Sequence, residues 1–376
     1  MKRVLISGYY GFHNTGDEAI LTAICQLLSP FELEIKVLTA QEDHELQGCQ
    51  FQAIQRTQMA QIYQTLQNTD LFISGGGGLF QDVTGLGSIP YYGGLLWLAR
   101  RLNVPTLIFS QGLGPLRMPW SRWAVSKIFH GCSGISLRDQ DAIDLLKEIK
   151  GPVQRTVLSA DPVLAMRGMP PGRAEEILRQ EGLNPDYPII GVSIRPWKTW
   201  YEKQLKSFTA VLSQFARQAR AQLLFIPFQA DQDTWMCHEA AYAIQTRPAA
   251  CQPGLHVLRG NYSPLEIFSL IGQMDMIVGM RLHSLIMAAA NRVPAVGIVY
   301  DPKVRSFSEM VGYPFMGSVT SLSHSDHFYQ YLFTTWQERE AIRKSLDQKL
   351  PALENRVYEA VRIALQLLGI DYENFE

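Results

Sequence analysis

An arginine and a histidine lie two positions apart where one apolar segment ends and another begins, as Arg281-Leu282-His283. Residues 275–279 are typical of a buried strand, and residues 285–290 of a buried helix. In an open α/β sheet, ligands bind where a strand leads into a helix, and the first N–H groups of that helix favour an anion. The pair therefore predicts an anionic substrate and a proton-transfer step. Taken alone, the pair is more simply explained by a salt bridge beside a histidine that is hydrogen-bonded in the core.

Three other predicted strands also end close to a cation. Arg138 follows residues 135–137, Arg195 follows residues 189–194, and Lys303 lies in Asp301-Pro302-Lys303 after residues 296–300. If two sheets face each other across a cleft, four cations at this class of position would converge on a small polyanion. Arginine offers a planar fork that matches a carboxylate or phosphate, whereas lysine acts as a point charge.

Glycine-bearing loops follow the first and third predicted strands. Residues 8–18 contain three glycines and open the first helix, and residues 75–78 are four consecutive glycines. The glycine spacing does not match a dinucleotide-binding loop, and no Walker A lysine follows any of these loops. The glycines allow a ligand or a helix to approach the backbone closely, although a tight turn explains any one of them equally well.

Alternating strands and helices must position these residues, which predicts parallel, doubly wound sheets. Proline clusters at residues 169–172 and 184–188 indicate a linker. We therefore expect an α/β protein with an N-terminal Rossmann-like domain (residues 1–165) on the acceptor side. A C-terminal Rossmann-like domain (residues 185–335) would lie on the donor side. Residues 336–376 are expected to form helices that pack back on the N-terminal domain, with a long amphipathic helix interrupted at Pro351.

Composition excludes several classes of function. The chain has 376 residues, 47% of them hydrophobic, and its 34 basic and 35 acidic residues nearly balance, so nucleic-acid binding is not expected. The five cysteines are scattered without metal-binding spacing, which fits a reducing cytoplasm. The first apolar run, residues 4–6, is too short for a signal peptide, and no run is long enough to span a membrane.

Several motifs together resemble the polysaccharide pyruvyltransferase family, and most closely its cell-surface-anchoring (CsaB-type) branch. They occur in order over most of the chain: Gly8-Tyr9-Tyr10-Gly11, Asn14-Thr15-Gly16-Asp17-Glu18-Ala19, Gly75-Gly76-Gly77, Gln111-Gly112-Leu113-Gly114-Pro115, Arg138-Asp139, Asp161-Pro162 and Arg281-Leu282-His283. The resemblance implies a GT-B-like pair of Rossmann-type domains. It also implies transfer of the enolpyruvyl unit of phosphoenolpyruvate onto two hydroxyls of a sugar, giving a pyruvate ketal and phosphate. In the CsaB-type branch the acceptor is N-acetylmannosamine on a lipid-linked cell-wall polysaccharide precursor.

The family's functional positions correspond here to Arg138, the Arg281–His283 triplet and Lys303. His13 departs from the pattern, because many relatives have glycine or another small residue at that position.

The implied chemistry agrees with the residue-level interpretation. Phosphoenolpyruvate carries a carboxylate and a phosphate, so we expect Arg138, Arg195, Arg281 and Lys303 to bind it. His283 would be the general acid or base, and Arg138 and Arg281 would stabilise the departing phosphate. A weaker set of predicted acceptor-binding residues comes from the loops: Tyr10, Asn14, Asp17, Glu18, Gly76, Gly77 and Gln111. We expect no metal and no cofactor, with phosphoenolpyruvate as co-substrate.

Two alternative functions, and a possible membrane role for one surface segment, are also consistent with the sequence. The same fold could carry a nucleotide-sugar glycosyltransferase, or a non-catalytic protein that binds anions or glycans. Residues 117–129 mix two tryptophans with three cations, which suits peripheral membrane contact at the inner face of the cytoplasmic membrane. An ordinary helix packed on its sheet explains that segment at least as well.

Overall fold

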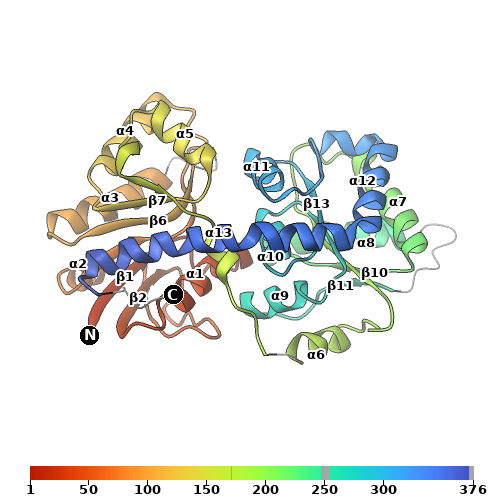
Figure 1. The fold of residues 1–376 in the computed structure, drawn as a ribbon, viewed down its shortest axis with the longest axis horizontal. Coiled ribbons are helices and arrows are strands. Elements are labelled where there is room, and N and C mark those ends of the chain that lie inside the picture. Colours follow the sequence, from red (N-terminus) through yellow and green to blue (C-terminus); the bar gives the residue numbers. More distant parts are fainter. Residues whose placement is uncertain (84, 86, 171, 247–253, 372–376) are drawn as a thin grey trace. The chain divides into compact units, whose positions relative to one another are not determined.

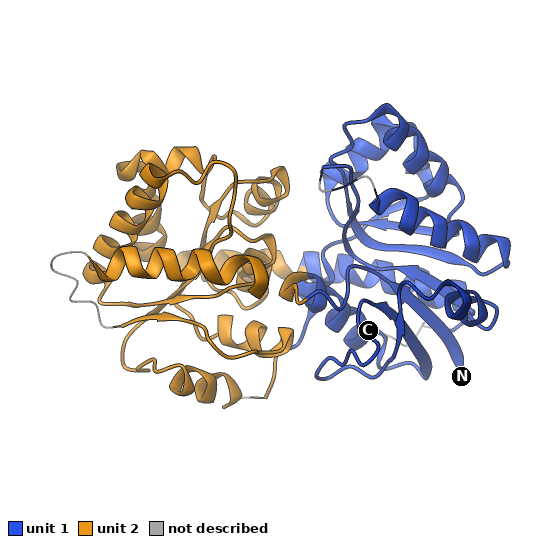
Figure 2. Cartoon of the chain, turned by 180° about the vertical axis from the view of Figure 1, so that it is seen from behind, with its two compact units in different colours: residues 1–12, 17–167, 352–376 blue, residues 13–16, 168–351 orange. Residues whose placement is uncertain are grey.

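The computed structural model describes residues 1–83, 85, 87–170, 172–246 and 254–371. The chain forms two compact units (Figure 2). Unit 1 contains residues 1–12, 17–167 and 352–376, and unit 2 contains residues 13–16 and 168–351. A four-residue segment near the N-terminus thus belongs to unit 2, whereas the residues on both sides of it belong to unit 1.

Unit 1 is built on an eight-stranded parallel sheet in the order β3-β2-β1-β4-β6-β7-β8, with β5 paired to β6. Its strands are β1 (Lys2–Ser7), β2 (Leu33–Thr39), β3 (Gln52–Gln55), β4 (Leu71–Ser74), β5 (Gly77–Phe80), β6 (Thr106–Leu113), β7 (Gly134–Leu137) and β8 (Thr156–Leu158). Its helices are α1 (Thr15–Leu28), α2 (Met59–Leu66), α3 (Ser88–Arg101), α4 (Pro119–His130) and α5 (Gln140–Glu148). Helices α2 to α5 share one hydrophobic core with one face of the sheet, and Ile363 and Leu367 near the C-terminus pack on Gly134 of β7.

Unit 2 contains a six-stranded parallel sheet in the order β11-β10-β9-β12-β13-β14. Its strands are β9 (Ile189–Ser193), β10 (Gln222–Phe225), β11 (Leu255–Val257), β12 (Met276–Gly279), β13 (Ala295–Ile298) and β14 (Phe315–Met316). Its helices are α6 (Arg173–Gln180), α7 (Glu202–Ala219), α8 (Ala230–Gln245), α9 (Pro264–Ile271), α10 (Leu282–Ala290), α11 (Pro302–Val311) and α12 (Ser325–Gln337). Strands β9, β10, β12 and β13 are buried throughout, as expected for a parallel sheet covered on both faces.

Both sheets reverse their strand order at one place. In unit 1 this switch point lies between β1 and β4, where Ser7 pairs with Ser74. In unit 2 it lies between β9 and β12, where Ser193 pairs with Gly279. Ligands of open α/β sheets bind beyond the strand ends at such points, so each unit has one position where a substrate is expected.

The α/β class and the two Rossmann-like folds are confirmed, but the units differ from the predicted domain boundaries. Residues 13–16 belong to unit 2 and not to the N-terminal domain, and residues 168–184 are part of unit 2 and not a separate linker. The C-terminal helix α13 (Arg339–Leu368) is divided, with its residues up to Pro351 in unit 2 and the rest in unit 1.

The predicted interruption at Pro351 was wrong, since α13 is continuous (Figure 1). Proline removes one backbone hydrogen bond from a helix. Here the buried side chains of Leu346, Leu350, Leu353 and Val357 on both sides of the proline favour the helix through their packing.

Candidate functional site

Arg281 lies at the switch point of unit 2 and is held rigidly. It is the N-cap residue of α10, two positions after the end of β12, and its side chain is buried. Its Nε donates to Oδ2 of Asp233 at 2.9 Å and its Nη2 to Oδ1 at 2.6 Å, while Nη2 also donates to Oε1 of Gln229 at 3.3 Å. A bidentate pair of this kind fixes the plane of the guanidinium group.

Asp233 is the buried partner that makes this arrangement possible. It is fully buried in α8, and its Oδ2 also accepts from the backbone N–H groups of Phe228 and Gln229 at the start of that helix. Four hydrogen bonds from one arginine and two amides compensate the cost of burying the carboxylate. Asp233 therefore joins the start of α8 to the outlet of β12.

His283 lies against the segment 13–16. It is the second residue of α10 and is half-buried, and a methyl group at Gly16 would collide with its Nδ1. The segment is fixed to unit 2 because Thr15 N donates to Phe228 O at 2.8 Å and Asn14 forms an antiparallel bridge with Gln229. Gly16 thus gives the imidazole a flat backbone surface that a side chain would occupy.

Two further cations follow the neighbouring strands β9 and β13. The guanidinium of Arg195 lies 5.1 Å from the ring centre of Tyr300 and 5.5 Å from that of Trp197. Its buried Nε has no hydrogen-bond partner among the described residues. Lys303 is half-buried in the first turn of α11, where Asp301 caps the helix by accepting from the Lys303 backbone N–H. Arg195, Arg281 and Lys303 thus follow three adjacent strands of one sheet.

Arg138 occupies a similar position in unit 1, after β7. Its Nη1 donates to Asp161 at 2.7 Å and its Nε to Asp139 at 3.3 Å. Burial would lower the pKa of Arg138, but the two carboxylates raise it above its usual range. A Cβ added to Gly112 would lie 2.9 Å from Nε of Arg138, so this guanidinium also rests on a glycine.

Neutral polar side chains lie at the switch point of unit 1. The ring of Tyr10 lies on Gly8 and its hydroxyl on Gly75, and burial raises the pKa of that hydroxyl. Gln111 Nε2 donates to Ser74 Oγ at 2.8 Å and to Gly75 O at 2.6 Å. Three buried oxygens here have no hydrogen-bond partner among the described residues: Ser7 Oγ, Tyr10 Oη and Gln111 Oε1.

Of the other predicted acceptor residues, Glu18 has a structural role and Asp17 is partly accessible. Glu18 is buried and accepts from Gly11 N at 2.7 Å and from His44 at 3.0 Å, so it holds its own loop. Asp17 is only partly buried, and its Oδ1 lies 3.0 Å from a Cβ added at Gly77.

Gly76, another predicted acceptor residue, and His13, which departs from the family pattern, are two positions set by backbone geometry. Gly76 packs on Ile20, where an added Cβ would lie 2.9 Å from a methyl group. His13 has a φ of 53°, in the left-handed region that favours glycine, so a side chain at this position requires a strained backbone.

Sequence reasoning missed Asp233, Gln229 and the roles of Gly16 and Gly112. Asp233 lies in the polar run Asp231-Gln232-Asp233, which is typical of a solvated helix start, so only the tertiary structure reveals its burial. Asp161 was noted within the motif Asp161-Pro162, and its pairing with Arg138 supplies the physical reason for it.

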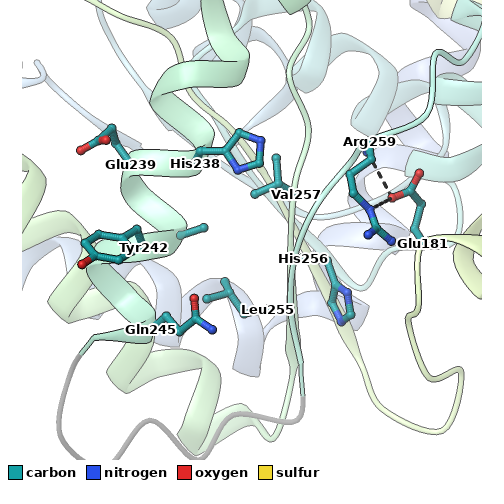
Figure 3. Close-up of a pocket in the computed structure, with 10 residues that line it drawn as sticks. Glu181, His238, Glu239, Tyr242, Gln245, Leu255, His256, Val257 and Arg259 are labelled. Carbon is teal, nitrogen blue, oxygen red and sulfur yellow. Dashed lines mark hydrogen bonds and ion pairs between the residues drawn. The ribbon is translucent and has the colours of Figure 1, made fainter.

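A separate cavity of about 540 Å³ lies between α8 and β11 in unit 2 (Figure 3). Its lining includes His238, Tyr242, His256 and Arg259, with Glu181 bound by the backbone of residues 259 and 260. β11 is the edge strand, and none of the predicted substrate ligands lines this cavity. We therefore do not assign the reaction to it.

Nowhere in the described ranges do three His, Cys, Asp or Glu side chains gather as a metal-binding set. None of the helices within those ranges combines the length and apolar character needed to cross a bilayer.

Comparison with solved structures defines the class of fold. Anabaena HepE in complex with UDP-glucose matches with a TM-score of 0.59 at 12% identity, covering 98% of this chain and 99% of that one. The UDP-GlcNAc 2-epimerase of Methanocaldococcus jannaschii matches with a TM-score of 0.61 at 11% identity over 90% and 92% of the two chains. Staphylococcus aureus MnaA bound to UDP matches with a TM-score of 0.61 at 10% identity over all of both chains. At these identities the likeness shows the fold, which is GT-B-like with two Rossmann-type domains.

The sequence itself identifies the family. The model of the polysaccharide pyruvyl transferase family matches residues 14–302, which is most of the chain. The protein belongs to that family and is a transferase of polysaccharide pyruvylation. The match begins at the segment that contacts His283 and ends next to Lys303.

Proposed function

We propose that the protein transfers the enolpyruvyl unit of phosphoenolpyruvate onto two hydroxyls of one sugar, forming a pyruvate ketal and releasing phosphate. The observation that carries the proposal is the row of Arg195, Arg281 and Lys303 after three adjacent strands, with His283 beside Arg281. A molecule with a carboxylate and a phosphate on three carbons needs several cations at fixed positions. Membership of the pyruvyl transferase family supports this choice of donor.

The arginines of unit 2 retain donors for such an anion. Asp233 and Gln229 engage Nε and Nη2 of Arg281, and Nη1 donates to no described residue. The Nε of Arg195 has no hydrogen-bond partner among the described residues, so it can donate to the anion. In this proposal, these nitrogens and the Lys303 ammonium bind the carboxylate and phosphate, and Arg138 of unit 1 is the fourth cation.

The proton transfers are assigned to His283. C3 of phosphoenolpyruvate gains a proton, a sugar hydroxyl loses its proton as its oxygen bonds to C2, and the C2–O bond to phosphate breaks. The second hydroxyl then bonds to C2 and loses its proton, which completes the ketal. Arg281 and Arg138 stabilise the charge on the leaving phosphate. No step requires a metal or an organic cofactor.

The acceptor is assigned to the loops of unit 1. The partly buried carboxylate of Asp17 and the polar groups at the switch point suit a neutral, hydroxyl-rich sugar. On the family resemblance we propose N-acetylmannosamine in a lipid-linked cell-wall polysaccharide precursor. The protein would then work at the inner face of the cytoplasmic membrane.

The direct test is to incubate the protein with phosphoenolpyruvate and a panel of aryl and lipid-linked hexosaminides. We expect one hexosaminide to gain the mass of a ketal-linked pyruvate, with one phosphate released per product. Release of phosphate without a modified sugar, or no reaction with any acceptor, would contradict the proposal.

A nucleotide-sugar glycosyltransferase is the second candidate, because the solved structures of similar fold include complexes with UDP and UDP-glucose. Thermal-shift measurements with phosphoenolpyruvate, UDP-sugars and GDP-sugars separate the two. Stabilisation by a nucleotide sugar and not by phosphoenolpyruvate would favour the glycosyltransferase. Ligand-induced stabilisation without turnover on any acceptor would favour a non-catalytic binding protein.

A further inference from the structure

Three exposed tryptophans lie on the neighbouring helices α3 and α4 of unit 1. Trp97 of α3 is 57% exposed, and Trp120 and Trp123 of α4 are 40% and 65% exposed. Burying such large apolar side chains is favourable, and a folded protein rarely exposes several of them together without a partner.

The contacts between the two helices place these side chains on one face. α3 and α4 pack side by side (Figure 1), with Gly93 against Ile128 and Arg100 against Gly131. Trp97 lies four residues after Gly93 and three before Arg100, so it lies along the border with α4. On α4, the buried residues Ser121, Val125 and Phe129 define the opposite, core-facing side.

The charged side chains of this face all have the same sign. The sequence of α3 ends in Arg100 and Arg101, and α4 contains Arg122 and Lys127, while neither helix contains an aspartate or glutamate. Arg100, Arg101 and Lys127 are exposed, and the Arg101 guanidinium lies 5.4 Å from the ring centre of Trp97. Arg122 forms an ion pair with Glu148, which neutralises its charge.

The start of α4 is held in place. Asp82 accepts from the backbone N–H groups of Arg117 and Met118 at 2.9 and 2.8 Å, and Trp120 Nε1 donates to Met118 Sδ at 3.2 Å. Met118 is itself 43% exposed. The aromatic and basic side chains are therefore presented by fixed helices, which lowers the ordering cost of binding a flat surface.

We infer that this aromatic–basic face, formed by Trp97, Arg101, Trp120, Trp123 and Lys127, docks unit 1 on an anionic phospholipid bilayer. Tryptophan side chains are suited to the headgroup level of a bilayer, and cations beside them are attracted to its negative surface. The five side chains of this face include two cations and no carboxylate, and the nearby Glu148 is paired with Arg122, so the face complements an anionic membrane. The inference deepens the proposed function, because a lipid-linked acceptor would be reached from this surface.

The experiment is co-sedimentation of the full chain with vesicles of phosphatidylcholine alone and of phosphatidylcholine with phosphatidylglycerol. We expect binding to the anionic vesicles that weakens as salt is raised. Trp120→Ala/Trp123→Ala should lower the partition coefficient about tenfold or more. Arg101→Ala/Lys127→Ala should lower it about fivefold for each charge removed.

Trp235→Ala is the matched control, since Trp235 is 62% exposed on α8 of unit 2. Absence of binding to anionic vesicles, or equal losses in the Trp120/Trp123 and Trp235 variants, would overturn the inference. Equal binding of all variants with a retained salt effect would also overturn it. Phosphate release with a soluble aryl acceptor, measured on the same variants, tests the transferase proposal separately and should not change.

Discussion

Each unit contains a buried arginine–aspartate pair at a strand end, but the two pairs have different surroundings. In each, an arginine after a parallel strand is buried and bound by an aspartate from another element: Arg138 by Asp161 and Arg281 by Asp233. In each, a glycine supplies a flat surface, Gly112 beneath Arg138 and Gly16 beside His283.

The difference is the balance of charge. Arg138 contacts two carboxylates, Asp161 and Asp139, whereas Arg281 contacts one carboxylate among the described residues, Asp233. Unit 2 then adds Arg195 and Lys303 after the strands on either side of β12. Positive charge is therefore in excess at the strand ends of unit 2 and compensated at those of unit 1. An anionic donor is therefore better matched to unit 2, with Arg138 as its proposed ligand from unit 1, and a neutral sugar is better matched to the loops of unit 1.

The largest expected effect separates two histidines. His283→Ala should lower ketal formation by about 10²–10⁴-fold, because a positioned general acid or base is lost. Stabilisation by phosphoenolpyruvate in a thermal shift should largely survive, since the cations remain. His44→Ala in unit 1 is the control, because His44 contacts Glu18 and takes part in no proposed proton transfer. Near-normal turnover of His283→Ala would remove His283 from the mechanism.

The second effect concerns the buried aspartates. Asp233→Ala and Asp161→Ala should each lower the free energy of unfolding by about 3–5 kcal/mol, because each leaves a buried arginine without its main partner. Urea denaturation of both variants measures this. Asp139→Ala serves as the control: its carboxylate is more exposed and makes the longer contact with Arg138, so its loss should be smaller. Equal losses for all three would mean that burial of the counterion does not matter here.

The sequence predicted most of what is local. Short apolar runs predicted the central strands, and the alternation of strands and helices predicted the doubly wound sheets. Arg138, Arg195 and Arg281 could be found in the sequence because each directly follows an apolar run, and Lys303 because it lies a few residues after another. Contacts between distant residues were not visible: Asp233 and Arg281 are 48 positions apart, and the segment 13–16 joins unit 2 through Phe228 and Gln229. Neither contact leaves a periodic signal in the sequence, since both depend on how the strands are ordered in the sheet.

The third effect compares the two glycines. Gly16→Ala would push a methyl group into the imidazole of His283, and Gly112→Ala would crowd the guanidinium of Arg138. A displacement of about 1 Å at a reacting group can cost about 10²-fold in rate. We expect Gly16→Ala to lower kcat and Gly112→Ala to raise KM for phosphoenolpyruvate, as measured by steady-state phosphate release. Gly94→Ala, where an added Cβ meets nothing within 4 Å, should leave both constants unchanged. The reverse pattern would mean that the proton-transfer group and the clamp have been assigned to the wrong units.

The smallest effect concerns two left-handed residues, His13 with a φ of 53° and Arg220 with a φ of 51°. His13→Gly and Arg220→Gly relieve the same backbone strain, of about 1–2 kcal/mol, but glycine also gains freedom in the unfolded chain. Each variant should therefore gain about 0.5 kcal/mol or less in the free energy of unfolding. Arg220 ends α7, far along the chain from any proposed substrate ligand, so its variant should keep wild-type kinetics. His13 lies three residues before Gly16, so a more flexible segment there should lower kcat slightly. The change in the free energy of unfolding should be the same for His13→Gly as for Arg220→Gly. If His13→Gly left kcat at the wild-type value, the segment 13–16 would have only a structural role within unit 2 and would not help to orient His283.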